Sequence, residues 1–90
     1  MRHYIAIVMP TGLGEWHVLF PDVPECEARG ASLENAKFAA AHELTRRIQA
    51  NGAKAPHPRD LSAIERDHEW LARNGVDLAT AVVTMIPLGG

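Results

Sequence analysis

A corner with two prolines constrains this chain more than any other feature. It lies in Leu19–Cys26, directly after a strand-like run, and contains Pro21 and Pro24. Neither proline can continue a central strand, because each lacks an N–H for the ladder and fixes its own φ. The chain must therefore turn sharply here between two β segments. Gly30 and Ser32 follow the corner and mark the start of a long helix.

Two strands are expected before the corner and a short one after it. His3–Met9 is rich in β-branched residues, and Glu15–Phe20 alternates between apolar and polar side chains. The turn between them holds Gly12 and Gly14, which can adopt positive φ, so the two segments predict a hairpin. Glu25–Arg29 is expected to be a third strand at a sheet edge, where its charged side chains discourage unwanted pairing.

A helix of about four turns is expected next. Ser32 is a good N-cap residue. The predicted apolar stripe consists of Leu33, Ala36, Ala40, Leu44 and Ile48, widened by Phe38, Ala39 and Ala41. Its small alanines predict a close approach to the sheet. Asn51-Gly52 is expected to end this helix in a left-handed cap.

The C-terminal third predicts a second helix and a final strand. Residues 61–74 are expected to form one helix, with Ser62 and Glu65 as a capping box and Asn74-Gly75 at its end. Its predicted apolar face consists of Leu61, Ile64, His68 and Leu71. Ala79–Leu88 is apolar on both sides, which favours a strand covered on both faces.

These elements predict an α+β fold with the order β-β-β-α-(α)-β. A meander makes the third strand parallel to the first, and a right-handed crossover would then place the fourth strand parallel beside the first. The expected structure is a four-stranded mixed sheet of order 3-2-1-4 with the long helix packed on one face. Residues 1–90 are expected to form a single domain, because domains typically take about 100–150 residues.

Composition points to a folded protein without a nucleic-acid-binding surface. Apolar residues make up 47% and charged residues 22% of the chain. A net charge of −2 lacks the basic stripe of a dedicated nucleic-acid binder. No segment approaches the ~20 apolar residues that span a bilayer, and no signal peptide is recognised, so we expect a cytoplasmic protein. The single cysteine, Cys26, predicts a small buried apolar residue.

Few residues offer catalytic or metal-binding chemistry. Two-metal nucleases need converging carboxylates, and only Asp22, Glu34 and Glu43 are placed for that purpose. In its proline corner, Asp22 is expected instead to accept hydrogen bonds from nearby backbone N–H groups. The five histidines show no paired ligand spacing. We therefore expect no catalytic residues, no metal and no cofactor.

Several motifs in this order resemble the HicB-like antitoxin family. They are Tyr4-Ile5-Ala6-Ile7, Phe20-Pro21-Asp22-Val23-Pro24-x-Cys26, Gly30-x-Ser32-Leu33-Glu34-x-Ala36 and Pro56-x-Pro58. Phe20, Pro21, Asp22, Pro24, Cys26, Gly30 and Ser32 are taken as the structural motif. The resemblance covers residues 2–59 well and the closing strand loosely.

This resemblance implies a truncated RNase H-like fold and the antitoxin role in a type II toxin–antitoxin system. The implied partner is a HicA-like ribonuclease that degrades mRNA and is blocked by direct binding. Homodimers or larger homo-oligomers are also implied. Glu25 stands where the family has glycine, so the backbone must avoid positive φ there or be strained. The family's separate DNA-binding domain has no counterpart in residues 1–90, so direct nucleic-acid binding is not expected.

The residues leave the binding surface and the activity open. Acidic residues around the second strand and the corner predict a contact surface for a basic ribonuclease: Glu15, Asp22, Glu25 and Glu27, with Trp16 nearby. An ordinary solvated edge explains the same residues equally well. The alternative functions are a stand-alone oligomeric regulatory or interaction module of the same fold and, disfavoured by the sparse carboxylates, a minimal RNA hydrolase.

Overall fold

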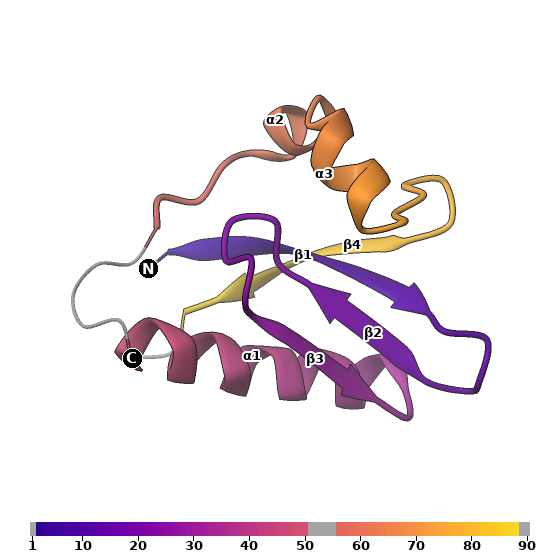
Figure 1. The fold of residues 1–90 in the computed structure, drawn as a ribbon. Helices are drawn as coiled ribbons and strands as arrows, with labels where there is room; N and C mark the ends of the chain where they lie inside the picture. Colours follow the sequence, from indigo (N-terminus) through magenta and orange to yellow (C-terminus); the bar gives the residue numbers. More distant parts are fainter. Residues whose placement is uncertain (1, 51–55, 89–90) are drawn as a thin grey trace.

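A four-stranded sheet lies between two helical layers in the computed structural model of the chain, which describes residues 2–50 and 56–88 (Figure 1). The strands are β1 (His3–Pro10), β2 (Trp16–Leu19), β3 (Glu27–Gly30) and β4 (Val82–Pro87). The helices are α1 (Leu33–Ala50), α2 (Leu61–Glu65) and α3 (His68–Arg73). Helix α1 covers one face of the sheet, and α2 and α3 lie over the other (Figure 1).

The sheet has the predicted order β3-β2-β1-β4. Strands β1 and β2 form the predicted hairpin, with Val8 opposite Val18, and β2 pairs antiparallel with β3. Gly12 and Gly14 have φ of 85° and 81°, as a tight turn between the two strands requires. The third strand begins two residues later than predicted, because the corner continues to the hydrogen bond from Cys26 N–H to Val23 O at 2.9 Å.

The prediction of a mixed sheet was wrong, because β4 runs antiparallel to β1 with Ala6 opposite Thr84. The chain crosses the sheet twice between β3 and β4. Helix α1 returns along one face, and the segment carrying α2 and α3 then crosses the other face in the opposite direction (Figure 1). Two crossings reverse the direction that one crossover would have given β4. The handedness rule for parallel neighbours therefore does not apply to this pair.

The larger hydrophobic core lies between α1 and the sheet. The helix contributes the predicted stripe of Ala36, Ala40, Leu44 and Ile48, all buried. From the sheet come Tyr4, Ala6, Val8, Val18 and Ile86, and Phe20 joins them from the start of the corner. Phe38 does not widen the stripe as predicted, since 80% of its surface is exposed on the outer side of α1. The predicted Asn51-Gly52 helix end lies outside the described residues.

The predicted single helix over residues 61–74 is two short helices. Asp60 caps α2 by accepting from Ala63 N–H at 2.9 Å, and Asp67 caps α3 by accepting from Trp70 N–H at 3.2 Å. Ser62 is therefore inside α2 and is not its N-cap. The end at Asn74 and Gly75 is confirmed, with Gly75 at φ 64°.

A smaller core lies under α2 and α3. Ile64, Trp70 and Leu71 are buried against the sheet residues Ile5, Ile7 and Leu19. The predicted apolar face was wrong at His68 and Leu61, which are exposed. The break at Asp67 turns α3 so that Trp70 faces the sheet in place of His68. None of the described helices is long and apolar enough to cross a membrane.

Strand β4 is not covered on both faces as predicted. It lies at a sheet edge, where Val83 is 36% and Met85 60% exposed. Ile86 is buried under α1, whereas Val83 and Met85 face the side of α2 and α3 and lie beyond the reach of these short helices. The apolar composition of this strand therefore reflects one buried face and one open face.

Candidate partner-binding surface at the proline corner

The corner is built on three buried side chains. Phe20, Val23 and Cys26 belong to the core under α1. Two successive turns connect them, closed by hydrogen bonds from Val23 N–H to Phe20 O at 3.2 Å and from Cys26 N–H to Val23 O at 2.9 Å. Among the described residues no side-chain-bearing residue has positive φ. The backbone at Glu25, which stands where the HicB-like family that the sequence resembles has glycine, therefore avoids positive φ.

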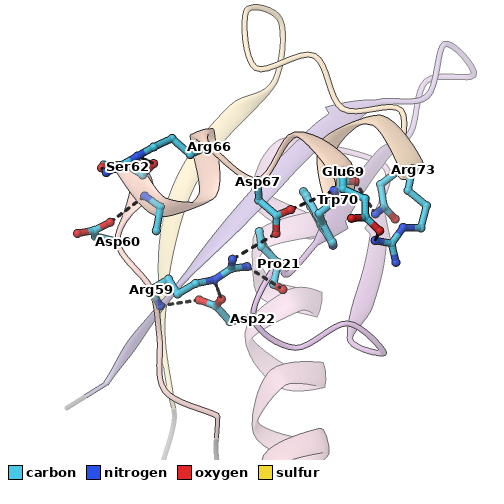
Figure 2. Close-up of polar contacts among 12 residues, drawn as sticks. Pro21, Asp22, Arg59, Asp60, Ser62, Arg66, Asp67, Glu69, Trp70 and Arg73 are labelled. Atoms are coloured by element: carbon cyan, nitrogen blue, oxygen red, sulfur yellow. Dashed lines mark hydrogen bonds and ion pairs between the residues drawn. The ribbon is translucent and has the colours of Figure 1, made fainter.

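Asp22 was wrongly predicted to bond to nearby backbone groups. Its carboxylate accepts from the backbone N–H of Arg59 at 2.7 Å and from Arg59 Nε at 2.5 Å, although the two residues are 37 positions apart (Figure 2). The Asp22 side chain is only 5% exposed. Burial leaves a carboxylate dependent on its partner, because an unpaired charge is costly away from water. Asp22 thus holds the corner to residue 59 and presents little charge to solvent.

Arg59 connects the corner to the second helical layer. Besides Asp22, its guanidinium donates to Asp67 Oδ2 at 3.2 Å and to Pro21 O at 3.4 Å (Figure 2). The hydrogen bond with Asp22 is the main reason that the pKa of Arg59 is raised. The Trp70 N–H and then Arg59 hold the pKa of Asp67 below its usual value. One arginine therefore ties together the corner and the N-terminus of α3.

The Pro56-x-Pro58 stretch brings Arg59 into place. Tyr4 is buried beneath α1, and its hydroxyl donates to Pro56 O at 2.5 Å. Pro58 keeps His57 out of the helical region, so residues 56–60 form no helix before α2 begins. Arg59 was not among the site residues predicted from the sequence. The signal that could have found it is a basic residue directly after the Pro-x-Pro motif, together with an acidic residue in the corner.

Gly30 and Ser32 fix the start of α1 against the sheet. A Cβ on Gly30 would lie 2.3 Å from the backbone N of Ala36, so only glycine allows this approach. Ser32 Oγ accepts from Asn35 N–H at 3.1 Å, which confirms Ser32 as the N-cap. The glycine therefore sets how closely the helix lies against β3, and the serine sets where the helix begins.

Cys26 is buried, as predicted, at 1% exposure. Burial, followed by the nearby charge of Glu43, raises the pKa of its thiol to about 11. The thiolate is the reactive form of cysteine, and at neutral pH it is nearly absent here. Cys26 is therefore a packing residue of the corner.

The predicted acidic residues do not form one cluster. Glu25 lies in the corner, 88% exposed, with an oxygen 3.9 Å from Arg47 Nη1 of α1. Glu27 is 60% exposed and 3.3 Å from His17 Nε2. Glu15 directly precedes Trp16, the first residue of β2. Glu27 lies opposite Leu19 at the other end of that strand, so the two glutamates are separated by roughly 10–13 Å along the strand.

Trp16 lies on the other side of the sheet from His17. It is half-buried, stands opposite Gly30 in the register, and packs against the core under α1. A pocket of about 340 Å³ instead adjoins Glu25. It lies between the corner and the last turns of α1 and is lined by Asp22, Val23, Pro24, Glu25, Arg47, Ala50 and Pro56. The surface around Glu25 thus combines an exposed carboxylate with a pocket.

Two of the three carboxylates considered for nuclease chemistry are bound by arginines, in different places, and the third, Glu34, lies in the first turn of α1. Asp22 bonds to Arg59, and Glu43 accepts from Arg46 Nη2 at 2.8 Å and from Arg47 Nε at 3.2 Å. The Arg46 hydrogen bond is the main reason that the pKa of Glu43 is lowered. Within residues 2–50 and 56–88, no three His, Cys, Asp or Glu residues are grouped so that they could hold a metal ion.

Two solved structures resemble this chain over its whole length. One is the N-terminal domain of the Burkholderia pseudomallei antitoxin HicB, with a TM-score of 0.75, 13% identity, and coverage of 99% of this chain and 100% of the other. The fold is that of a HicB N-terminal domain. A chain of a HicA3 and HicB3 toxin–antitoxin complex is similar with a TM-score of 0.71, 18% identity and the same coverage. No protein-family model and no curated protein sequence matches the chain.

The likeness to HicB agrees with the resemblance found in the sequence. The motif residues Phe20, Cys26, Gly30 and Ser32 all have structural roles in the corner and at the start of α1. Identities of 18% and 13% establish the shared fold and leave the activity to be argued from the surface.

Proposed function

We propose that this chain is an antitoxin-type binding protein that neutralises a HicA-like, mRNA-degrading ribonuclease by direct contact. The observation that carries this proposal is the full-length likeness to the HicB antitoxin domain and to a chain of the HicA3–HicB3 complex. The chain itself acts as a binder without catalysis, and its place of action is the cytoplasm, where such a ribonuclease meets mRNA.

The proposed contact centres on Glu25, which lines the pocket of the corner, and on Glu27 at the start of β3. A ribonuclease that holds RNA needs a basic groove, and acidic residues on its inhibitor speed association and favour the correct partner. Both glutamates are largely exposed, so their carboxylates are accessible to a basic partner. Glu15 extends the proposed surface along β2, Trp16 supports that strand from the core side, and Asp22 supports the surface from within the corner.

Co-expression with the neighbouring reading frame tests the proposal. The expected toxin is a basic protein of roughly 60–80 residues with a double-stranded-RNA-binding-like fold. Its expression alone should stop growth, and co-expression of the present chain should restore growth. No rescue and no complex with such a neighbour would refute the antitoxin role and favour a stand-alone interaction module.

Charge reversal tests the proposed surface separately. The double variant Glu25→Lys, Glu27→Lys should bind the toxin at least tenfold more weakly at low salt, because two attractive charges become repulsive. The matched control is Glu65→Lys, Glu69→Lys, which makes the same change in net charge on α2 and α3 and should leave the affinity nearly unchanged. Equal affinity of wild type and the first variant at low salt would remove Glu25 and Glu27 from the interface.

A further inference from the structure

The pocket beside the corner has walls of two kinds. Its lining combines four apolar residues, Val23, Pro24, Ala50 and Pro56, with three charged ones, Asp22, Glu25 and Arg47. Its volume of about 340 Å³ is near the lower end of the range for small-molecule sites, so it accommodates one long side chain. Packing of the corner and the bonds of Arg59 explain the walls, but they leave the space between the walls without a role.

The charges of the pocket favour a cation. Two of its three charged residues are acidic. The third, Arg47, is bound through its Nε to Glu43 at 3.2 Å, which limits what it can offer to an incoming anion. Glu25 lies 3.9 Å from Arg47 Nη1, at the outer limit of an ion pair, and its side chain is 88% exposed. A cation placed closer to Glu25 than Arg47 is would therefore find this carboxylate available.

Asp22 supplies a second acceptor in the pocket wall. Each of its oxygens accepts one hydrogen bond from residue 59, one from the backbone N–H at 2.7 Å and one from the Nε at 2.5 Å (Figure 2). An ionised carboxylate accepts about four hydrogen bonds in all, so Asp22 retains capacity for a further donor. Because its side chain is only 5% exposed, a donor that enters the pocket would meet a carboxylate shielded from water, where a hydrogen bond is stronger.

The apolar walls distinguish between cations. An arginine side chain has a methylene stem that packs on apolar surface such as that of Pro24 and Ala50. Its guanidinium is planar, carries five donors and is less strongly hydrated than the ammonium of lysine. It can therefore bond to two carboxylates at once, whereas an ammonium acts as a compact point charge. These properties suit a pocket that combines prolines with two carboxylates.

We propose that the pocket binds one arginine side chain of the toxin, with its stem against Pro24 and Ala50 and its guanidinium between Glu25 and Asp22. This inference rests on the proposed function, and it adds to that function the type of residue that anchors the partner. Arginines that fill a pocket within an interface commonly carry a large part of the binding energy. Glu25 would then bond directly to the bound partner, besides attracting it at long range.

Filling the pocket tests the anchor. Ala50 is exposed and lines the pocket, so Ala50→Trp should occupy the space without disturbing the core, and it should weaken toxin binding about tenfold or more. Gln49→Trp is the matched control, because Gln49 is an exposed neighbour outside the pocket lining, and its affinity should stay within about twofold of wild type. Titration calorimetry with purified toxin measures the affinities, and circular dichroism identifies any variant that has failed to fold.

A double-mutant cycle identifies the side chain that enters the pocket. Each arginine of the toxin is replaced by alanine in turn. One replacement should weaken binding to wild type about tenfold and binding to Glu25→Gln by about threefold or less, because Glu25→Gln has already removed part of its contact. Glu27→Gln is the matched control: it removes the same charge outside the pocket, and the same toxin replacement should still cost about tenfold against it.

The outcomes separate this inference from the antitoxin role. A toxin that binds wild type and Ala50→Trp equally well would overturn the arginine anchor and leave the antitoxin role standing. Equal losses for Ala50→Trp and Gln49→Trp, or no toxin arginine coupled to Glu25, would do the same, as would coupling to a lysine or an aromatic residue instead. A wild-type chain that forms no complex with the toxin would refute the proposed function, and with it the toxin as the source of the arginine.

Discussion

Gly30 determines how closely α1 approaches the sheet. Its missing side chain leaves room for the backbone of Ala36, at a distance that no Cβ tolerates. The buried alanines at 36 and 40 continue this close contact along the helix. Gly30 was recognised in the sequence as part of the motif before the helix. The need for glycine at this position depends on the close contact between β3 and α1, which only the structure shows.

Replacing Gly30 by alanine should destabilise the protein by about 1–3 kcal/mol, because backbone atoms must move to admit the methyl group. Chemical denaturation measures the free energy of unfolding. Gly12→Ala is the control: its Cβ meets open space, and only the positive φ is unfavourable, at about 1 kcal/mol. A smaller loss for Gly30→Ala than for Gly12→Ala would contradict the packing argument.

Cys26 should react very slowly with thiol reagents in the folded protein. A pKa of about 11, against an ordinary 9.0, leaves about a hundredfold less thiolate at pH 8, and burial also limits access. The measurement is the rate of reaction with a disulfide reagent at pH 8, with and without denaturant. A folded-state rate close to that of the denatured chain would show that the thiol is exposed.

Single residues were predictable where their partners are near in sequence. Ser32 caps a helix through a residue three positions on, and burial of Cys26 follows from the usual behaviour of a lone cysteine as a small apolar residue. Asp22 was misread because its partner is 37 positions away. A carboxylate in a proline corner has a local explanation available, and nothing within the corner reveals the distant arginine.

At the scale of elements, Arg59 links the corner to α3. Arg59→Ala should lower the free energy of unfolding by about 2–4 kcal/mol, because the buried Asp22 carboxylate loses its guanidinium partner and keeps only the backbone N–H of residue 59. The 37% exposure of the arginine side chain favours the lower end. Denaturant unfolding measures the loss. Arg66→Ala removes an arginine that bonds only within α2 and should change stability by no more than about 0.5 kcal/mol. Similar losses for the two variants would contradict a special role for Arg59.

The break between α2 and α3 shows why element boundaries were misjudged. Ser62 and Glu65 match a capping box, yet the observed caps are Asp60 and Asp67. Either aspartate could have been recognised as a cap, since both are strong N-cap residues. The choice between one helix and two is decided by burial of Trp70 and by the bond from Arg59 to Asp67, which are tertiary interactions.

At the scale of the whole molecule, the two helical layers are unequal. Twelve buried residues form the core under α1, and six form the core under α2 and α3. Local opening is easiest where little apolar surface is buried. Amides of α3 should therefore exchange with solvent hydrogen faster than those of α1, by at least tenfold after correction for intrinsic rates. Equal protection in the two helices would show that the molecule opens only as one unit.

The strand order was predictable from the sequence, and the direction of the last strand was not. The meander, the long helix and the position of β4 beside β1 follow from local patterns and short connections. The direction of β4 depends on whether the segment carrying α2 and α3 crosses the sheet a second time. That choice is made by contacts such as Ile64 and Leu71 with Ile5 and Ile7, which no local pattern encodes.

The antiparallel pairing of β1 with β4 places Arg2 beside Leu88, joined by a backbone hydrogen bond of 2.9 Å. A short peptide could therefore connect the two ends without disturbing the sheet. New ends opened in the turn between β1 and β2, where Gly12 and Gly14 lie, would give a circularly permuted protein of the same fold. A domain fused before Arg2 and a domain fused after Leu88 would likewise both start from the same end of the sheet.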